Sequence, residues 1–289
     1  MAACSAIGSS GHATDSAAGT AAALASATVV PLATKLPAQI MHDDAMRLFE
    51  YDRSLPLDIK EEPVERDSGA VIHSFSYRDM AGKRDLAFLV LPEGTGPFGA
   101  VMFLPGGLSG RGEFLSDAVS FSKHGIASLL IDYPELYPVP VTDREAVTET
   151  IFEMREFSRL FDWLAARPEV DPHRLGLVGV SYGAVRAATF AGVEGARLKI
   201  AVPMSVPARY GTAAMAPFDP IAWVPYVSPG ALYIQEGTQD GWFTHDEAES
   251  LIAAAREPKR LVWYEANHGL NGQATADYMA WIVAALGSP

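Results

Sequence analysis

The chain has 289 residues, 35 of them acidic and 22 basic, so its formal net charge at pH 7 is −13. Nucleic acids and anionic membranes bind clustered Lys and Arg, so this acidic balance argues against either as a main partner. Hydrophobic residues make up 49% and charged residues 20% of the chain, which excludes bulk disorder. The single cysteine, Cys4, excludes an intramolecular disulfide and a cysteine-built zinc site. No apolar run reaches the length of about 18 residues that a transmembrane helix needs.

Small residues dominate the start of the chain. Residues 1–30 hold 22 Ala, Ser, Gly and Thr. Such side chains bury too little area to offset the entropy of ordering, so residues 1–40 are predicted to be a disordered tail. The first basic residue is Lys35, so a secretory signal is not predicted. However, residues 1–4 (Met-Ala-Ala-Cys) resemble the end of a bacterial lipoprotein signal. Two alternatives stay open: a lipid anchor at Cys4 on an extracytoplasmic protein whose true start lies upstream, or a tail cysteine on a cytoplasmic protein.

Strands and helices alternate after this tail. Residues 41–69 predict a short helix and a linker, and residues 70–289 predict one α/β domain. Apolar runs predict strands at 71–77, 86–91, 100–104, 126–131, 174–180, 198–204, 231–235 and 261–264. Periodic stretches predict helices at 113–123, 143–167, 181–191, 247–256 and 271–286. Two adjacent strands followed by βα repeats imply a mostly parallel sheet covered by helices.

The pattern G-x-S-x-G occurs at Gly179-Val180-Ser181-Tyr182-Gly183. An apolar strand precedes it and a helix of small residues follows, which is the strand–turn–helix context of a nucleophilic serine. The turn lifts the serine Oγ clear of the sheet, and the helix N-terminus points its N–H groups toward a forming oxyanion. Without that context the pattern would indicate only a serine-capped turn. The sequence therefore predicts Ser181 as a nucleophile.

A serine needs a base to take its proton, and only two histidines follow Ser181. His268 comes just after the strand at 261–264, in a loop at a strand's carboxyl end, where ligands gather in an open α/β sheet. His245 falls where the next helix starts. The sequence therefore favours His268 as the general base.

The base in turn needs a carboxylate to orient it. Asp240 follows the strand at 231–235 and gives the chain order Ser…Asp…His. Asp219 and Asp246 are alternatives. Asp219 lies in a proline-rich loop with no preceding strand end, and Asp246 suits the first turn of a helix. Asp240 is thus the predicted acid.

An oxyanion needs two N–H donors. One is predicted to be the backbone of Tyr182, the residue after the nucleophile. The other is predicted in the loop Leu-Pro-Gly-Gly-Leu-Ser-Gly at 104–110, whose glycines let the backbone turn an amide toward the substrate. The loop lacks the G-K-[ST] ending of a phosphate-binding P-loop.

Residues from about 70 to 287 resemble an α/β-hydrolase of the dienelactone-hydrolase-like serine esterase branch. The motifs that carry the resemblance are 104–107 (Leu-Pro-Gly-Gly), 179–183, 237–240 (Gly-Thr-Gln-Asp) and 267–269 (Asn-His-Gly). The resemblance implies an eight-stranded, mostly parallel sheet and cofactor-free hydrolysis of a small-molecule ester through an acyl-enzyme. Two departures are Pro105, where such hydrolases often carry His, and Ser181 in place of cysteine. A Pro-Gly opening also occurs in polyester-cleaving and cutinase-like relatives, so the resemblance implies the Gly107 N–H as the second oxyanion donor, with Leu108 as the second choice. The serine argues against dienelactone as substrate.

The substrate is less constrained than the reaction. About 25 residues with five prolines separate the strands at 198–204 and 231–235, too few for a large helical cap. Tyr137, Trp223, Trp242 and Phe243, with Tyr182, are predicted either to line an apolar acyl pocket or to pack over the sheet edge. No metal is predicted, since residues 42–44 (His-Asp-Asp) suit a helix start. An acyltransferase, a thioesterase, a peptidase and a non-catalytic binding protein remain alternatives.

Overall fold

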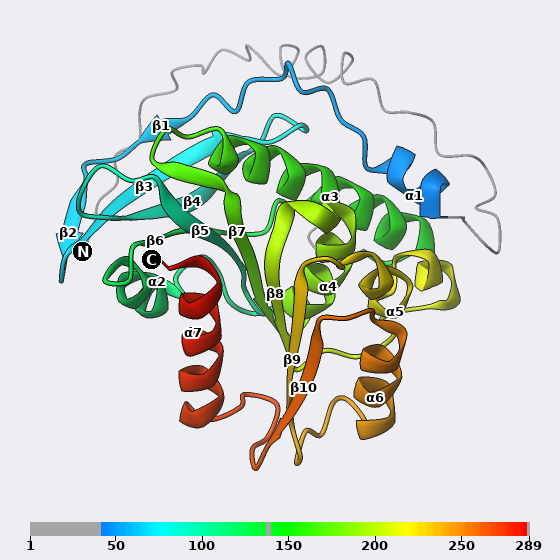
Figure 1. Cartoon of the computed structure of the whole chain (residues 1–289). Coiled ribbons are helices and arrows are strands. Elements are labelled where there is room, and N and C mark those ends of the chain that lie inside the picture. Colours follow the sequence, from blue (N-terminus) through cyan, green and yellow to red (C-terminus); the bar gives the residue numbers. More distant parts are fainter. Residues whose placement is uncertain (1–41, 137–139, 288–289) are drawn as a thin grey trace, which may run out of the picture. The chain divides into compact units, whose positions relative to one another are not determined.

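A computed structural model describes residues 42–136 and 140–287 of the chain (Figure 1). All of them fall within one unit, Ala33–Pro289. The predicted tail at 1–40, Cys4 and the predicted pocket residue Tyr137 lie outside the described residues.

A mixed sheet forms the centre of the described chain, where it has ten strands. The strands are β1 Lys60–Glu61, β2 Glu65–Asp67, β3 Ala70–Arg78, β4 Arg84–Pro92, β5 Phe98–Leu104, β6 Ile126–Ile131, β7 Val170–Val180, β8 Leu198–Met204, β9 Ala231–Gly237 and β10 Lys259–Tyr264. Their order is β1-β3-β4-β6-β5-β7-β8-β9-β10, with β2 also paired to β3. Strands β5 to β10 run parallel, and β1 to β4 pair antiparallel. The sheet is thus mostly parallel, as predicted.

The eight predicted strands correspond to β3 to β10, and the sheet has two strands more than expected. The additional strands, β1 and β2, are short and consist of exposed residues only. An edge strand without a buried side chain carries no alternation of apolar and polar residues, so its sequence gives no period-2 signal. Both pair with β3, so part of the predicted linker joins the sheet edge.

Helices cover both faces of the sheet (Figure 1). The α-helices in the described ranges are α1 His42–Leu48, α2 Leu115–Ser122, α3 Asp143–Ala165, α4 Tyr182–Glu194, α5 Pro220–Trp223, α6 His245–Ala254 and α7 Gly272–Leu286. Helices α2 and α7 share one face, where the rings of Phe121 and Tyr278 meet. Helices α3 and α4 pack together on the other face through Phe157, Phe161 and Phe190.

Local sequence sets where the helices begin. Helices α3 and α6 each begin with a capping box, formed by Thr142 with Glu145 and by Thr244 with Glu247. In each, the threonine side chain accepts the backbone N–H of the glutamate, and the glutamate side chain accepts the backbone N–H of the threonine. Asn271 caps α7 by accepting two N–H groups. Residues 205–230, between β8 and β9, contain only α5 and two 3-10 turns, so this segment forms no large helical cap.

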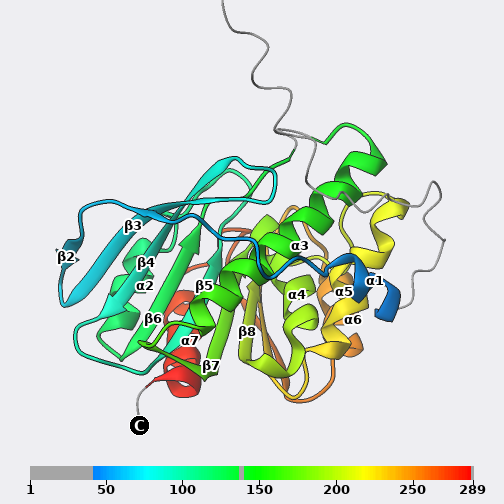
Figure 2. The ribbon, with the colours of Figure 1, turned by 90° about the horizontal axis from the view of Figure 1, so that it is seen from above.

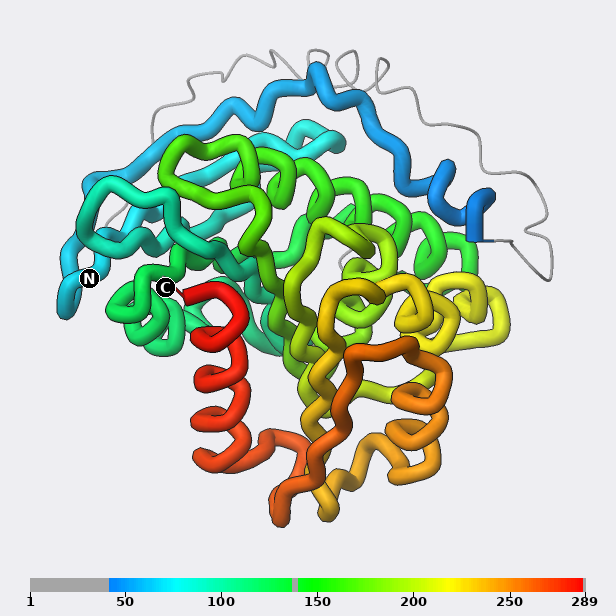
Figure 3. The backbone as a smooth tube through the Cα atoms, in the orientation of Figure 1, coloured from blue at the N-terminus to red at the C-terminus, as the bar shows by residue number. Residues whose placement is uncertain are grey.

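The N-terminal part of the described chain runs along α3. Arg155 donates to the Leu48 carbonyl and Arg159 to the Pro56 carbonyl, and Figure 2 shows this segment lying on the helix. At the carboxyl ends of the strands, the loops after β9 and β10 lie side by side (Figure 3). Thr238 N–H donates to the Tyr264 carbonyl and Gln239 N–H to the Ala266 carbonyl. This edge gathers the predicted site residues.

Candidate active site

Ser181 occupies a strained turn between β7 and α4. Its φ is +54° and its ψ is −119°, a combination that non-glycine residues rarely adopt. The flanking glycines are required by close backbone contacts. A Cβ on Gly179 would lie 2.3 Å from the Gly183 carbonyl oxygen, and one on Gly183 would lie 2.1 Å from that of Leu104. The G-x-S-x-G pattern therefore reflects the crossing of strand and helix.

The structure brings Ser181, His268 and Asp240 into one hydrogen-bonded line. His268 Nε2 lies 2.8 Å from Ser181 Oγ, and His268 Nδ1 lies 2.7 Å from Asp240 Oδ2. The Asp240 side chain is 2% exposed, while that of His268 is 24% exposed. The second carboxylate oxygen, Oδ1, accepts the N–H groups of Trp242 at 2.7 Å and Phe243 at 3.2 Å. The carboxylate is thereby fixed toward the imidazole.

The alternative acids and base lie elsewhere. His245 is the first residue of α6, and its ring contacts that of Trp263. Asp246 lies in the first turn of the same helix. Asp219 is buried at the start of α5, where it accepts the Tyr210 N–H, and burial raises its pKa to about 6. Each of these placements matches the reason for which the sequence disfavoured that residue.

The loop with Gly107 touches the serine turn. A Cβ on Gly107 would lie 3.2 Å from Tyr182 Cβ. The peptide unit between Pro105 and Gly106 is held at both ends. Its carbonyl, from Pro105, accepts Tyr133 Oη–H at 2.8 Å, and its N–H, from Gly106, donates to Glu113 at 2.6 Å. Two side chains thus fix the loop beside Ser181. The Leu108 side chain is fully exposed.

Tyr182 is anchored by a buried ion pair that the sequence did not reveal. Its hydroxyl donates to Glu153 at 2.9 Å and accepts from Arg186 at 2.6 Å. Arg186 Nε lies 2.7 Å from Glu153 Oε2, and both side chains are at most 5% exposed. Burial raises the pKa of Glu153, and burial together with Glu153 raises that of Tyr182. The spacing of Tyr182 and Arg186, four residues apart on α4, was the available signal.

A family match adds to this geometry. Residues 23–212, about two thirds of the chain, match the FrsA-like esterase family. The chain belongs to the FrsA-like esterase family. It is a carboxylic ester hydrolase with the α/β-hydrolase fold. The match includes Ser181 and ends before Asp240 and His268.

Solved structures share the fold of this FrsA-like esterase. Acetyl xylan esterase 1 from a Thermoanaerobacterium species has a TM-score of 0.73 and 15% identity, covering 84% of this chain and 92% of its own. An acetyl xylan esterase from a Paenibacillus species has a TM-score of 0.69 and 18% identity, and the match covers 84% of this chain and 93% of that one. A putative dienelactone hydrolase from Klebsiella pneumoniae has a TM-score of 0.62 and 19% identity, and the match covers 75% of this chain and 98% of that one. No curated protein matches the chain significantly.

The predicted pocket residues of this FrsA-like esterase have different surroundings. Phe243 and Trp242 lie next to the His268 ring, at centroid distances of 5.2 and 6.0 Å, and Trp242 is 79% exposed. Trp223 is instead 1% exposed: its ring packs against that of Phe49, and its indole N–H donates to the Pro217 carbonyl. Trp223 therefore belongs to the core. Tyr210 was not predicted; its ring packs edge-on against that of Tyr182.

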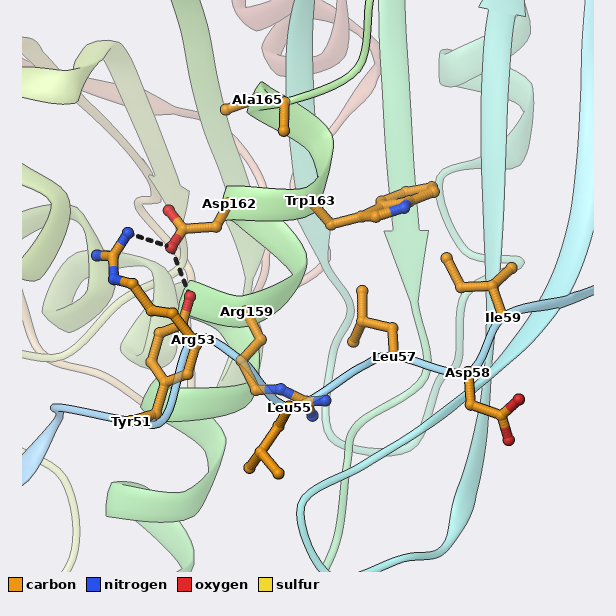
Figure 4. A pocket seen from close by; sticks show the side chains of 11 residues that line it. Tyr51, Arg53, Leu55, Leu57, Asp58, Ile59, Arg159, Asp162, Trp163 and Ala165 are labelled. Atoms are coloured by element: carbon orange, nitrogen blue, oxygen red, sulfur yellow. Dashed lines mark hydrogen bonds and ion pairs between the residues drawn. The ribbon is translucent and has the colours of Figure 1, made fainter.

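A groove of about 720 Å³ lies away from these residues, between residues 51–59 and α3 (Figure 4). In this groove, the Asp162 carboxylate accepts a hydrogen bond from the Tyr51 hydroxyl and forms an ion pair with Arg53. Among the described residues, no group of three His, Cys, Asp or Glu side chains is arranged to hold a metal. Likewise, no helix in the described ranges has the length and apolar character needed to cross a membrane.

Proposed function

We propose that this esterase cleaves its substrates with Ser181 as nucleophile, His268 as general base and Asp240 as the orienting acid. The observation that carries the proposal is the unbroken line of two hydrogen bonds, 2.8 and 2.7 Å long, from the serine through the imidazole to a buried carboxylate. Such a line activates an otherwise weak nucleophile.

The reaction proceeds in two halves. His268 takes the hydroxyl proton as Ser181 Oγ attacks the ester carbonyl, and the imidazolium then protonates the leaving alcohol. Water activated by His268 releases the acid from the acyl-enzyme. Asp240 holds the imidazole in the required tautomer throughout.

The backbone N–H groups of Tyr182 and Gly107 stabilise the oxyanion. The contact between these two residues supports this role, as do the hydrogen bonds that hold the peptide unit between Pro105 and Gly106. Donors held in place before the reaction cost no reorganisation when charge develops.

We propose a small-molecule ester as the substrate, with Trp242 and Phe243 flanking the acyl or alcohol group beside His268. Two neighbours of the same fold are named acetyl xylan esterases, which makes short acyl groups the first choice for testing. The same serine chemistry would serve an acyltransferase, a thioesterase or a peptidase. A panel of aryl acetate, thioester and peptide substrates with an added alcohol separates these activities.

The decisive experiment compares Ser181→Ala with Ser250→Ala, a control at an exposed serine of α6. Ser181→Ala should lower aryl acetate hydrolysis by about 10⁴-fold or more and abolish fluorophosphonate labelling, with the fold retained. The control should behave as wild type. Wild-type turnover by Ser181→Ala would refute the proposed nucleophile, and a wild-type protein that neither labels nor turns over would favour a binding protein.

A further inference from the structure

Ser205, the residue that follows β8, lies in an unusual and fully enclosed position. Its exposed fraction is 0%, and its φ is +55°, in the left-handed region that non-glycine residues seldom occupy. The N–H donates to the Gln235 carbonyl at 2.8 Å, and the hydroxyl donates to the carbonyl of His268 at 2.7 Å. A strained conformation persists only where its surroundings fix it, and here both polar groups of Ser205 are fixed.

The two neighbours of Ser205 contact the other parts of the site. The Met204 carbonyl accepts the N–H of Ser181 at 2.9 Å. The N–H of Val206 donates to Glu236, four residues before Asp240, at 2.8 Å. Residues 204–206, which we call the β8 corner, therefore hydrogen-bond to the serine turn, to the His268 loop and to the strand that leads to Asp240.

The His268 loop needs such an attachment. Its neighbours Asn267 and Gly269 are exposed, and Leu270 also has a positive φ of +58°. The Ser205 hydroxyl holds the loop from its buried side at the main chain of His268 itself. A displacement of the imidazole by about 1 Å is enough to cost about 100-fold in rate.

We propose that Ser205 is a positioning residue for ester hydrolysis: its hydroxyl holds the backbone of His268 so that the imidazole stays aligned between Asp240 and Ser181. The inference rests on the proposed function, because it assigns Ser205 a role through the general base. Ser205 itself contacts the base only through the main-chain carbonyl.

The test uses Ser205→Ala and Ser205→Gly in the full chain. Both remove the hydroxyl. Glycine adopts a positive φ without strain, so Ser205→Gly keeps the test valid if Ser205→Ala fails to fold. Each variant should lower kcat by about 10- to 100-fold, with little change in KM. The loss should appear in kcat and not in KM, because a misaligned base slows the chemical step while substrate binding is kept.

Ser122→Ala is the matched control. Ser122 is a buried serine of α2 whose hydroxyl also donates to a backbone carbonyl at 2.7 Å, that of Val119. It should lose stability to a similar degree as the Ser205 variants, with wild-type kcat and KM. Wild-type kcat in Ser205→Gly, or equal losses of kcat in Ser205→Gly and Ser122→Ala, would overturn the positioning role while Ser181→Ala remains inactive. An active Ser181→Ala would overturn the proposed function and this inference together.

Discussion

The two helical layers on the sheet differ in what they bury. Helices α2 and α7 cover their face chiefly with apolar side chains, such as Phe121, Ile282 and Leu286, and their main polar contact joins Tyr278 to Asp117. Helices α3 and α4 bury charged side chains as well. These are Glu149, Glu153, Glu156, Arg159, Arg186 and Glu194.

One pair of these buried charges lies where α4 begins. This helix starts at the serine turn, and its first residue, Tyr182, is proposed to bind the oxyanion. The buried side chains of Glu153 and Arg186 both hydrogen-bond to the Tyr182 hydroxyl. Replacing a buried ion pair by apolar residues is often neutral or stabilising, so stability alone does not account for the pair. We infer that the Glu153–Arg186 pair of the polar layer orients Tyr182, whereas the apolar layer supplies stability.

The largest effect is expected from Arg186→Met, which leaves Glu153 buried without its cation. Breaking a buried pair costs about 3–5 kcal/mol of unfolding free energy. The hydroxyl of Tyr182 also loses a donor, so kcat should fall. Urea unfolding and aryl acetate kinetics measure the two losses.

The double variant Glu153→Met with Arg186→Met serves as the control. It removes both charges, so it should recover much of the stability, while kcat stays low because Tyr182 remains unanchored. Full recovery of kcat would contradict an orienting role for the pair.

Ile282→Ala tests the apolar layer. Ile282 is 0% exposed in α7, and shortening it should cost about 3 kcal/mol through lost burial and the cavity left behind. Among the described residues, no hydrogen bond joins α7 to Ser181, Asp240 or His268, so kcat and its pH profile should stay at wild-type values. Thr275→Ala, at an exposed position of the same helix, should change stability by less than about 0.5 kcal/mol. A fall in kcat in folded Ile282→Ala would show that the two layers are coupled.

Sequence patterns predicted the features that are local. The strands β3 to β10 are apolar runs, and Ser181, Asp240 and His268 each follow a strand in a motif of a few residues. Features that join distant residues were missed. The Ser205 hydroxyl reaches a carbonyl 63 residues away, and Tyr182 reaches Glu153 across 29 residues.

Trp223 illustrates the same limit for the pocket. An aromatic residue in a loop between two strands gives no sign of which side it faces. Its burial against Phe49 depends on where the N-terminal segment lies, and no local pattern specifies this.

The smallest effect is expected from Glu194→Gln, which tests the polar layer through pH. Burial raises the pKa of Glu194 from 4.5 to about 7, even though Arg197 lies 2.6 Å away. The folded state then binds this proton more tightly than the unfolded state. The stability it contributes is therefore fully present below about pH 4.5 and is lost as the pH rises through about 7.

Glutamine cannot ionise, so the loss should disappear in the variant. Between pH 5 and pH 8, the unfolding free energy of Glu194→Gln should rise relative to wild type by roughly 2 kcal/mol. Urea titrations at the two pH values measure this change. Glu93→Gln, at a side chain that is 63% exposed, should show no such difference. If the unfolding free energies of wild type and Glu194→Gln depended on pH in the same way, the Glu194 carboxylate at the end of α4 would be solvated. The contrast between the two helical layers would then rest on Glu153 and Arg186.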